Sequence, residues 1–389
     1  MLEKAKALQA ELSRLRRTIH MHPELGFEEF QTGALVAQTL SDLGIEMQTG
    51  VAKTGIIGRI GNGNGPVIGI RADMDALPIL EANDVAYKSQ VPGKMHACGH
   101  DSHTTMLLGA AMLLKDVPFD GEIRLIFQPS EERQDDEGKS GGMRMVEEKA
   151  LEGLDAVIGL HVVGMMDRGQ VMLDDGFVLA NVDTIYAKVK GKGGHGAQPH
   201  LSRDPIFMMG PILTALHGIV SRWVSPTEPA VVTVGKMVGG TVNNVIPSEV
   251  ELEITCRSLN DDVREQLVYE VEQALSIARN LGGDYEMRRV TGYPALYNDP
   301  KVVGWLKETA VEFLGADNVH ARGPSMGGED FAYMSRASQG AMIFLGVKDP
   351  EGPPRFLHHP EFDLDEAAMP IGAALLAETA LRFVNKRYQ

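Results

Sequence analysis

The sequence predicts an α/β protein whose main domain has a mixed, mostly parallel sheet with helices on both faces. Three observations predict this class. Short apolar runs alternate with helical patterns over residues 51–163, as they do where strands are joined through helices. From residue 181 the order becomes β-α-β-β-α-β, the split βαβ arrangement of a ferredoxin-like α+β domain. Both kinds of pattern return near residue 296. We therefore expect residues 1–180 and 295–389 to form one domain, with residues 181–294 inserted as a second.

The N-terminal segment predicts an amphipathic surface helix. Leu8, Leu12, Leu15 and Ile19 recur at helical spacing among charged residues. A signal peptide would instead have an uninterrupted apolar core.

Three buried strands are predicted next, at Val67–Ile70, Ile123–Phe127 and Ala156–Leu160. An apolar helix is predicted after Ser102, which we place as its N-cap. We interpret GNGNG at 61–65 as a hairpin turn, since no GK[ST] follows to complete a phosphate loop.

Polar side chains close each of these strands. Asp73 and Asp75 follow the first, Glu131 and Glu132 follow the second, and His161 closes the third. Functional groups of such sheets gather beyond the carboxyl ends of the strands. We therefore expect these side chains to lie near one edge.

The inserted domain alternates strands of period two with two longer helical patterns. Within the first of these helical patterns, Pro211 is expected to bend or split the helix. The predicted strands are residues 182–193, 229–240, 248–258 and 284–290, and the predicted helices are residues 204–223 and 261–281.

Composition narrows the classes of function. The formal net charge of −16 argues against nucleic-acid binding and against docking on anionic lipid. No apolar run reaches the roughly 18 residues of a membrane span. Two cysteines, Cys98 and Cys256, leave no disulfide scaffold and favour a reducing compartment. We expect a cytoplasmic protein with neither nucleic acid nor a membrane as partner.

The stretch HACGHD, residues 96–101, concentrates groups that bind metals. Cys98 and His100 lie two positions apart, so both point to one side of an extended backbone. A thiolate with an imidazole suits zinc, or manganese, cobalt or nickel. Taken alone, the pair could equally be a buried cysteine and a helix-capping histidine.

Three further clusters favour the metal site. Adjacent Glu131 and Glu132 close a hydrophobic strand, His161 closes another, and His358 and His359 stand together later in the chain. Each has a plainer interpretation: a solvated strand end, a core histidine and a surface turn. Four such clusters rarely coincide by chance, and the predicted sheet would bring several of them to one edge. The sequence therefore favours a metal site over the plainer interpretations.

Eight motifs, in their order along the chain, resemble the M20 metallopeptidase family. The greatest similarity is to its amidohydrolase branch, which includes hippurate hydrolases, N-acyl-amino-acid amidohydrolases and indole-acetyl-amino-acid hydrolases. The resemblance runs from the helix before HPELGFEE to near the C-terminus. The motifs are RADMDALPI, MHACGHDSHTTMLLGAA, IFQPSEE, GLHV, GKGGHGAQPH, VNNVIPSEVELEITCRS, MGGEDFAYM and FLHHPEFDLDEAA.

The resemblance implies a catalytic domain that holds two divalent metal ions. Glu131 is implied as the general base beside the metals, and Asp73 and Asp75 as residues that orient ligand histidines. The choices of Glu131 over Glu132 as base, and of His358 over His359 as ligand, rest on the resemblance. Simple strand-end capping is the alternative for the aspartates. The implied ligands are Cys98, His100, Glu132, His161 and His358.

The resemblance also implies that the inserted domain is a lid and dimerisation domain, in a homodimer or homotetramer. His195 is implied to stabilise the oxyanion, often from the partner subunit, and a solvent-facing histidine in a glycine-rich turn is the alternative. Asn244 and Arg257 match substrate-holding positions; Arg257 could instead be a surface arginine on a strand. Relatives usually continue the glutamate pair with a short glycine-rich stretch, whereas this chain has the acidic loop 133–142.

The function that the resemblance implies is metal-dependent hydrolysis of the amide bond of an N-acyl-L-amino acid, such as an N-acetyl or N-benzoyl compound. The products are a carboxylic acid and a free amino acid. A dipeptidase or aminopeptidase on the same fold is the alternative, and a non-catalytic binding protein should have lost a ligand or the base. A serine hydrolase is disfavoured because no G-x-S-x-G elbow is present.

Overall fold

The structure is a computed structural model that describes residues 1–386. The chain forms two compact units. Unit 1 comprises Met1–Gly176, Tyr297–Gly323 and the chain from Asp330 on, and unit 2 comprises Phe177–Leu296 with Pro324–Glu329. The last three residues of the predicted first domain lie outside the described residues.

Unit 1 contains an eight-stranded sheet in the order β1-β2-β4-β3-β5-β16-β6-β15. Its centre is parallel, because β4, β3, β5 and β16 pair in parallel, while β1 and β2 add antiparallel strands at one side. The strands are β1 Glu46–Val51, β2 Gly55–Gly61, β3 Val67–Asp73, β4 Glu122–Gln128, β5 Ala156–Asp167, β6 Val171–Met172, β15 Val319–His320 and β16 Gln339–Lys348.

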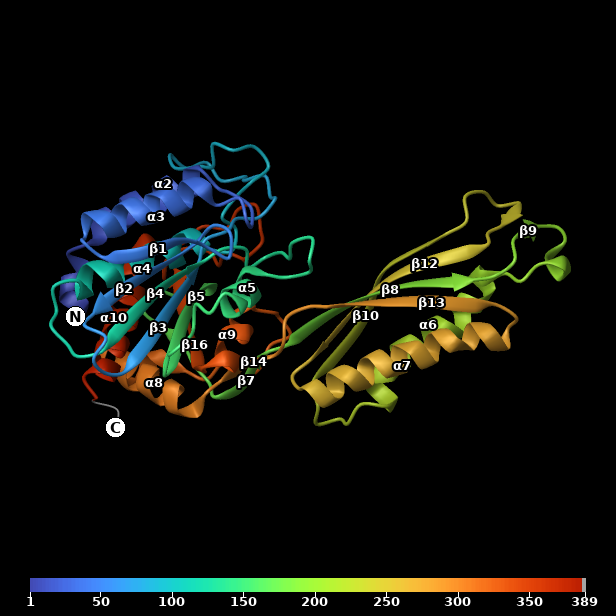
Figure 1. Ribbon diagram of the computed structural model, residues 1–389. Coiled ribbons are helices and arrows are strands. Elements are labelled where there is room, and N and C mark those ends of the chain that lie inside the picture. The colour runs from blue at the N-terminus through green and yellow to red at the C-terminus, as the bar shows by residue number, and fades with distance from the viewer. Residues whose placement is uncertain (387–389) are drawn as a thin grey trace. The chain divides into compact units, whose positions relative to one another are not determined.

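Helices cover both faces of this sheet, as Figure 1 shows for unit 1. Helices α4 and α10 pack on one face over β3, β4 and β5, and α5 and α9 pack on the other. The α4 side carries the main apolar core, which includes Ile70, Leu125 and Ile158. The helices are α1 Leu2–Lys6, α2 Gln9–Met21, α3 Phe30–Asp42, α4 His100–Leu114, α5 Gly141–Glu147, α8 Pro300–Leu314, α9 Phe331–Ala337 and α10 Met369–Val384. The expected α/β class, with a mostly parallel sheet, is confirmed.

Three local predictions for unit 1 are wrong. Ser102 is not the N-cap of α4, because Gly99 in the left-handed region (φ 91°) precedes the helix and Ser102 lies in its first turn. His161 does not end its strand, because β5 continues to Asp167 beside β16. GNGNG is not a hairpin turn: β2 and β3 both pair with β4, so this loop must cross from one side of β4 to the other.

Helix α10 is the core helix of unit 1. The segment Glu366–Val384 is the only described helical segment long and apolar enough, by length and composition, to cross a membrane. Within that window 72% is buried inside the structure, against α4 and α8. Its apolar character is therefore explained by packing in the core.

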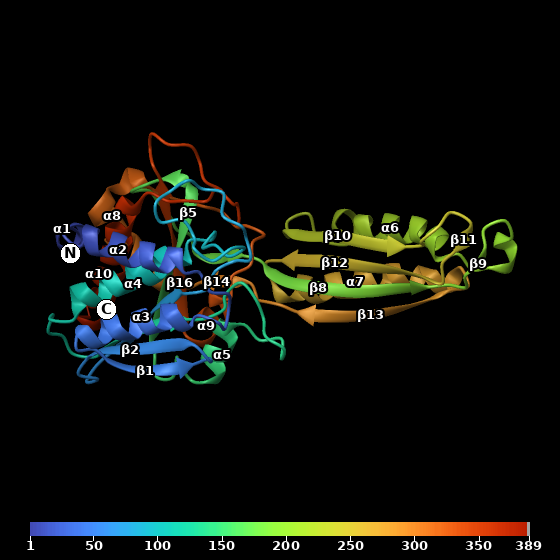
Figure 2. The ribbon, with the colours of Figure 1, turned by 90° about the horizontal axis from the view of Figure 1, so that it is seen from above.

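Unit 2 has the ferredoxin-like order that the sequence predicts. Its four-stranded antiparallel sheet runs β10-β12-β8-β13, and Figure 2 shows these strands side by side with α6 and α7 behind them. The helices bury one sheet face through residues such as Ile212, Leu267 and Ile254. The elements are β8 Asn181–Lys190, β9 Gly194–His195, α6 Pro205–Arg222, β10 Ala230–Gly239, β11 Val245–Ile246, β12 Glu249–Ser258, α7 Asp261–Asn280 and β13 Asp284–Thr291. Short strands β7 Gly176–Leu179 and β14 Leu296–Asn298 lie where the chain passes between units.

Of the two effects expected of Pro211, a bend or a split, the split does not occur. Helix α6 continues through it from Pro205 to Arg222. A proline removes one backbone hydrogen bond, here the one to the carbonyl of Phe207. Both residues are exposed, so water can satisfy that carbonyl.

Candidate metal centre

The structure brings the predicted metal ligands of unit 1 into one cluster. They come from the start of α4, the loop after β4, the middle of β5 and the loop before α10. Three overlapping groups each have ligand atoms within 4.8 Å of one another: Cys98 with His100 and His161, Cys98 with Glu132 and His358, and His100 with Glu131 and Glu132. Because the groups share members, all five predicted ligands and Glu131 form one continuous set.

Gly99 sets the geometry of the HACGHD turn. A Cβ atom at this position would lie 2.5 Å from Cγ2 of Val162, and the backbone has φ 91°. Only glycine adopts this conformation without strain and leaves that space. The turn directs Cys98 and His100 toward the same region just as α4 begins.

The two buried imidazoles each have one nitrogen held by a carbonyl. His100 Nδ1 donates to the main-chain oxygen of Asp75 at 2.9 Å and lies 3.1 Å from its Oδ1, and His161 Nδ1 donates to the main-chain oxygen of Val162 at 2.8 Å. The Nε2 atoms are therefore the nitrogens turned toward the cluster, and each can bind a metal ion when its imidazole is neutral. The Nε2 of His161 lies 3.5 Å from Cys98 Sγ, and the buried Nε2 of His100 has no hydrogen bond within the described chain.

The chemistry of these donors fits divalent metal ions. Burial, reinforced by the charge of Glu132, raises the pKa of the Cys98 thiol. A thiolate among carboxylates therefore needs a compensating cation. His358 belongs to the same set of donors, because its Nε2 lies 3.0 Å from Glu132 Oε1. Hydrogen bonds to Cys98 and Glu132 raise the pKa of His358 to about 10. Thiolate, imidazole and carboxylate together suit zinc and its divalent neighbours.

Asp75 contacts two of the predicted ligands. Its Oδ1 lies 3.1 Å from His100 Nδ1, and its Oδ2 accepts the main-chain N–H of Glu132 at 3.0 Å. Asp73 forms its hydrogen bond with a histidine outside the predicted ligand set. Its Oδ1 accepts from His103 Nδ1 at 2.7 Å, and the nearest predicted ligand atom is His100 Nε2, 3.7 Å from Oδ2.

Sequence reasoning missed His103 and a buried polar group around Asp330. His103 bonds to Asp73, and its Nε2 accepts the N–H of Val162 at 3.0 Å. Its spacing of three from His100 on α4 could have revealed it. Asp330 accepts from Arg71 at 2.9 Å and Gln128 at 2.8 Å, and its own N–H donates to Glu131 at 3.3 Å. These partners lie far apart in sequence, so no local signal identifies the group.

In unit 2 the structure brings His195 and Asn244 together but not Arg257. His195 pairs with Val245 in the β9–β11 ladder, and Gly196 N donates to the Asn244 carbonyl at 2.8 Å. Arg257 lies beside Val182 at the opposite end of the sheet. Arg257 lies eight positions after Glu249 on β12, a span of roughly 26 Å at 3.3 Å per residue. His195 and Arg257 of one chain therefore cannot contact the same small molecule.

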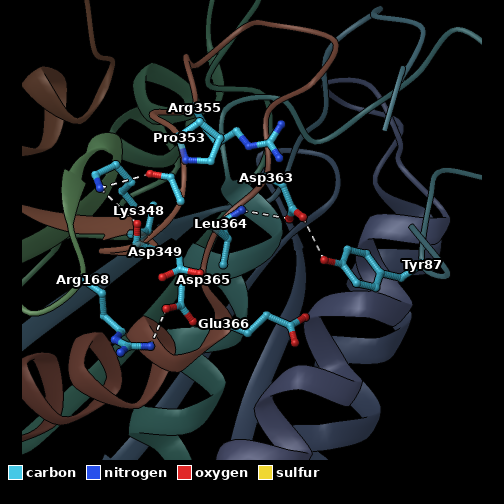
Figure 3. Close-up of a pocket in the computed structure, with 12 residues that line it drawn as sticks. Tyr87, Arg168, Lys348, Asp349, Pro353, Arg355, Asp363, Leu364, Asp365 and Glu366 are labelled. Carbon is cyan, nitrogen blue, oxygen red and sulfur yellow. Dashed lines mark hydrogen bonds and ion pairs between the residues drawn. The ribbon is translucent and has the colours of Figure 1, made fainter. Parts of the chain in front are cut away.

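Unit 1 also contains a cavity of about 550 Å³, and Figure 3 shows residues that line it. None of the predicted site residues lines it. Polar groups of its lining bind one another: Arg168 pairs with Asp365, the Tyr87 hydroxyl lies 2.9 Å from Asp363, and Lys348 donates to the Asp349 carbonyl at 3.0 Å. The cavity therefore has no unsatisfied group comparable with His100 Nε2.

The chain is similar to known hydrolases over almost its whole length. Residues 69–382 match the family described as Peptidase family M20/M25/M40. The IAA-amino acid hydrolase ILR1-like 4 of Arabidopsis thaliana is 39% identical over 95% of this chain and 85% of its own length. The N-acetyl-L-cysteine deacetylase of Bacillus subtilis is 39% identical over 97% and 89%. The structure of the Bacillus subtilis YxeP protein, a dinuclear metal-binding peptidase from the M20 family, is 33% identical with a TM-score of 0.84, covering 98% and 99%.

Proposed function

Because the chain belongs to peptidase family M20/M25/M40, we propose that it is a metal-dependent amidohydrolase acting on N-acyl-L-amino acids. It hydrolyses the amide bond and releases a carboxylic acid and a free amino acid. The observation that carries the proposal is the set of thiol, imidazole and carboxylate donors in unit 1, with Glu131 beside them. The names of the two hydrolase relatives describe enzymes that act on amino-acid conjugates, and this supports the proposed substrate class.

Two divalent cations, zinc, manganese, cobalt or nickel, are proposed to be held by the five ligands. These ligands are Cys98, His100, Glu132, His161 and His358. When bound, such cations polarise the amide carbonyl and lower the pKa of water. Asp75 fixes the ring of His100 and the backbone of Glu132, so it keeps two of the donors in place.

Glu131 is the proposed general base. Its carboxylate is buried beside Glu132, and the N–H of Asp330 donates to its Oε1. It takes a proton from the water that attacks the amide carbonyl carbon. It then gives that proton to the amine nitrogen as the C–N bond breaks, so the carboxylate is regenerated at the end of the cycle.

Arg257 is proposed to bind the α-carboxylate of the substrate, with Asn244 as a second polar contact. Within the described residues the guanidinium of Arg257 has no carboxylate partner: it donates only to Thr255 Oγ1 and the Met326 carbonyl, each at 3.3 Å. A planar guanidinium suits bidentate binding of a carboxylate.

His195 is proposed to stabilise the oxyanion from the partner subunit of a homodimer or homotetramer, with unit 2 as lid and dimerisation domain. Its separation from Arg257 within one chain supports a shared site. His195→Ala should lower kcat and leave the metal content unchanged. The variants His195→Ala and Glu131→Gln should each be inactive alone. Verified mixed dimers of the two variants should regain some activity. No recovery there would contradict the shared site.

The test is turnover by chelator-stripped protein reloaded with zinc, manganese, cobalt or nickel. The panel contains N-acetyl and N-benzoyl amino acids and dipeptides, and the assay detects the free amino acid. Release of the free amino acid from substrates of one acyl class, restored when metal is added back, supports the proposal. Release from dipeptides alone would favour a dipeptidase, and silence with no bound metal would refute the metal centre. A cytoplasmic location stays a prediction, tested by fractionating the source cells.

A further inference from the structure

The guanidinium of Arg322 has no direct carboxylate partner among the described residues. It follows strand β15 in unit 1, and its Cζ lies 4.0 Å from the ring centroid of Phe344. Its Nη1 is buried, and among the described residues the guanidinium has neither a hydrogen bond nor an ion pair. Asp174 is the nearby acid, but it accepts the main-chain N–H groups of Arg322 and Gly323. Burial lowers the pKa of Arg322, with the charge of Asp174 opposing.

The fully buried arginines of unit 1 have carboxylate partners, whereas Arg322 is partly exposed. Arg16 donates to Asp101 at 2.7 Å, and Arg71 donates to Asp73 at 2.8 Å and to Asp330. Pairing of this kind compensates the cost of removing the charge from water. Arg322 has only the ring of Phe344, which supplies a weaker attraction. A partner from outside the chain would complete its environment.

The sheet register places Arg322 next to the candidate metal centre. Across neighbouring strands, His161 on β5 is opposite Phe344 on β16, Phe344 is opposite Met172 on β6, and Met172 is opposite His320 on β15. Side chains in such a row share one face of the sheet. Arg322, two residues after His320, lies over Phe344, whose ring centroid is 6.4 Å from that of His161. One aromatic ring therefore separates the guanidinium from a proposed ligand.

We propose that Arg322 determines substrate specificity by binding a second carboxylate of the substrate, distinct from the α-carboxylate assigned to Arg257. The carboxylate is carried by the acyl group or by the amino-acid side chain. This inference rests on the proposed function and names a subclass of its substrates, the dicarboxylic N-acyl amino acids. A planar guanidinium offers two parallel N–H donors to such a group. A neutral substrate would leave the buried Nη1 atom of Arg322 without a hydrogen-bond acceptor.

The test compares pairs of substrates in which only one member carries the second carboxylate. N-succinyl-L-leucine is paired with N-butyryl-L-leucine for the acyl position, and N-acetyl-L-glutamate with N-acetyl-L-glutamine for the side-chain position. Metal-loaded wild type, Arg322→Met, Arg322→Lys and the control Arg168→Met are assayed. Arg168→Met also removes one positive charge from unit 1, but at the separate cavity.

The wild type should prefer the anionic member of at least one pair, and that pair identifies the position. Arg322→Met should lower kcat/KM for that substrate about 10- to 100-fold, mainly through KM, and leave its neutral match within about threefold. Arg322→Lys should retain part of the preference, and Arg168→Met all of it. No preference in the wild type, or an equal loss for both members in Arg322→Met, would overturn the proposal.

Failure of the proposed function itself gives a different result, because then no compound is hydrolysed by the wild type. Binding of the same pairs, measured by isothermal titration calorimetry, still decides the role of Arg322. Tighter binding of the anionic member by the wild type than by Arg322→Met supports the role. Equal affinities refute it.

Discussion

Replacing Asp75 by asparagine should weaken metal binding without unfolding the protein. The two oxygens of this buried carboxylate face two donors, His100 Nδ1 at 3.1 Å and the N–H of Glu132 at 3.0 Å. An asparagine can accept only one of them, because its NH₂ group would face the other donor. One charge-assisted hydrogen bond, with a net value of about 1.5–3 kcal/mol, is lost.

The main-chain carbonyl of Asp75 limits the damage. It accepts from His100 Nδ1 at 2.9 Å and is unchanged in the variant, so the tautomer of the ring is kept. Losing such an outer partner costs about 10- to 100-fold in metal affinity. Since one of the two contacts to His100 survives, we expect a value near the lower limit, about 10-fold.

The assay is titration of metal-free protein with zinc or manganese in competition with a chromophoric chelator. Asp116→Asn is the matched control, because the Asp116 side chain is 84% exposed and pairs only with Lys115 in the described structure. The control should bind metal as the wild type does. Affinity of a folded Asp75→Asn within twofold of the wild type would refute the argument that this carboxylate holds the ligands.

Three further predictions test the base, a buried carboxyl and unit 2. Glu131→Gln should retain its metals and lose about 10²- to 10⁴-fold in kcat, measured with stoichiometric metal loading; an unchanged kcat would remove Glu131 as the base. Burial, followed by the charge of Asp75, raises the pKa of Glu29 to about 7 from an ordinary 4.5. Between these values the folded state holds a proton that the unfolded state has lost, so stability should fall by up to about 3 kcal/mol as pH rises. Glu29→Gln should flatten this slope in urea unfolding at pH 5 and pH 7.5, and parallel slopes would contradict the assignment. Asp183→Asn leaves two arginines without their buried partner and should destabilise unit 2 by about 3–5 kcal/mol, far more than the exposed control Asp284→Asn; equal unfolding midpoints would argue against it.

Local patterns were sufficient to predict most elements of this fold. The strands near 67–70, 123–127 and 156–160 appear in the structure. Buried parallel strands are short apolar runs, and such a run can be recognised in the sequence without knowing which strand it pairs with. The predictions that are wrong involve neighbours that sequence does not reveal. The GNGNG loop looks like a hairpin turn until β4 is known to lie between the strands it joins.

The sequence by itself determined which donors are available: a thiol, imidazoles and paired carboxylates in motifs whose order indicates the family. Only the tertiary structure decided how they meet. The Nδ1 contacts that orient His100 and His161, the group around Asp330, and the separation of His195 from Arg257 all depend on strand order and register. Arg322 shows the same limit, since its lack of a direct carboxylate partner follows from the side chains that four strands place around it, and these positions lie up to 161 residues from Arg322 in the chain.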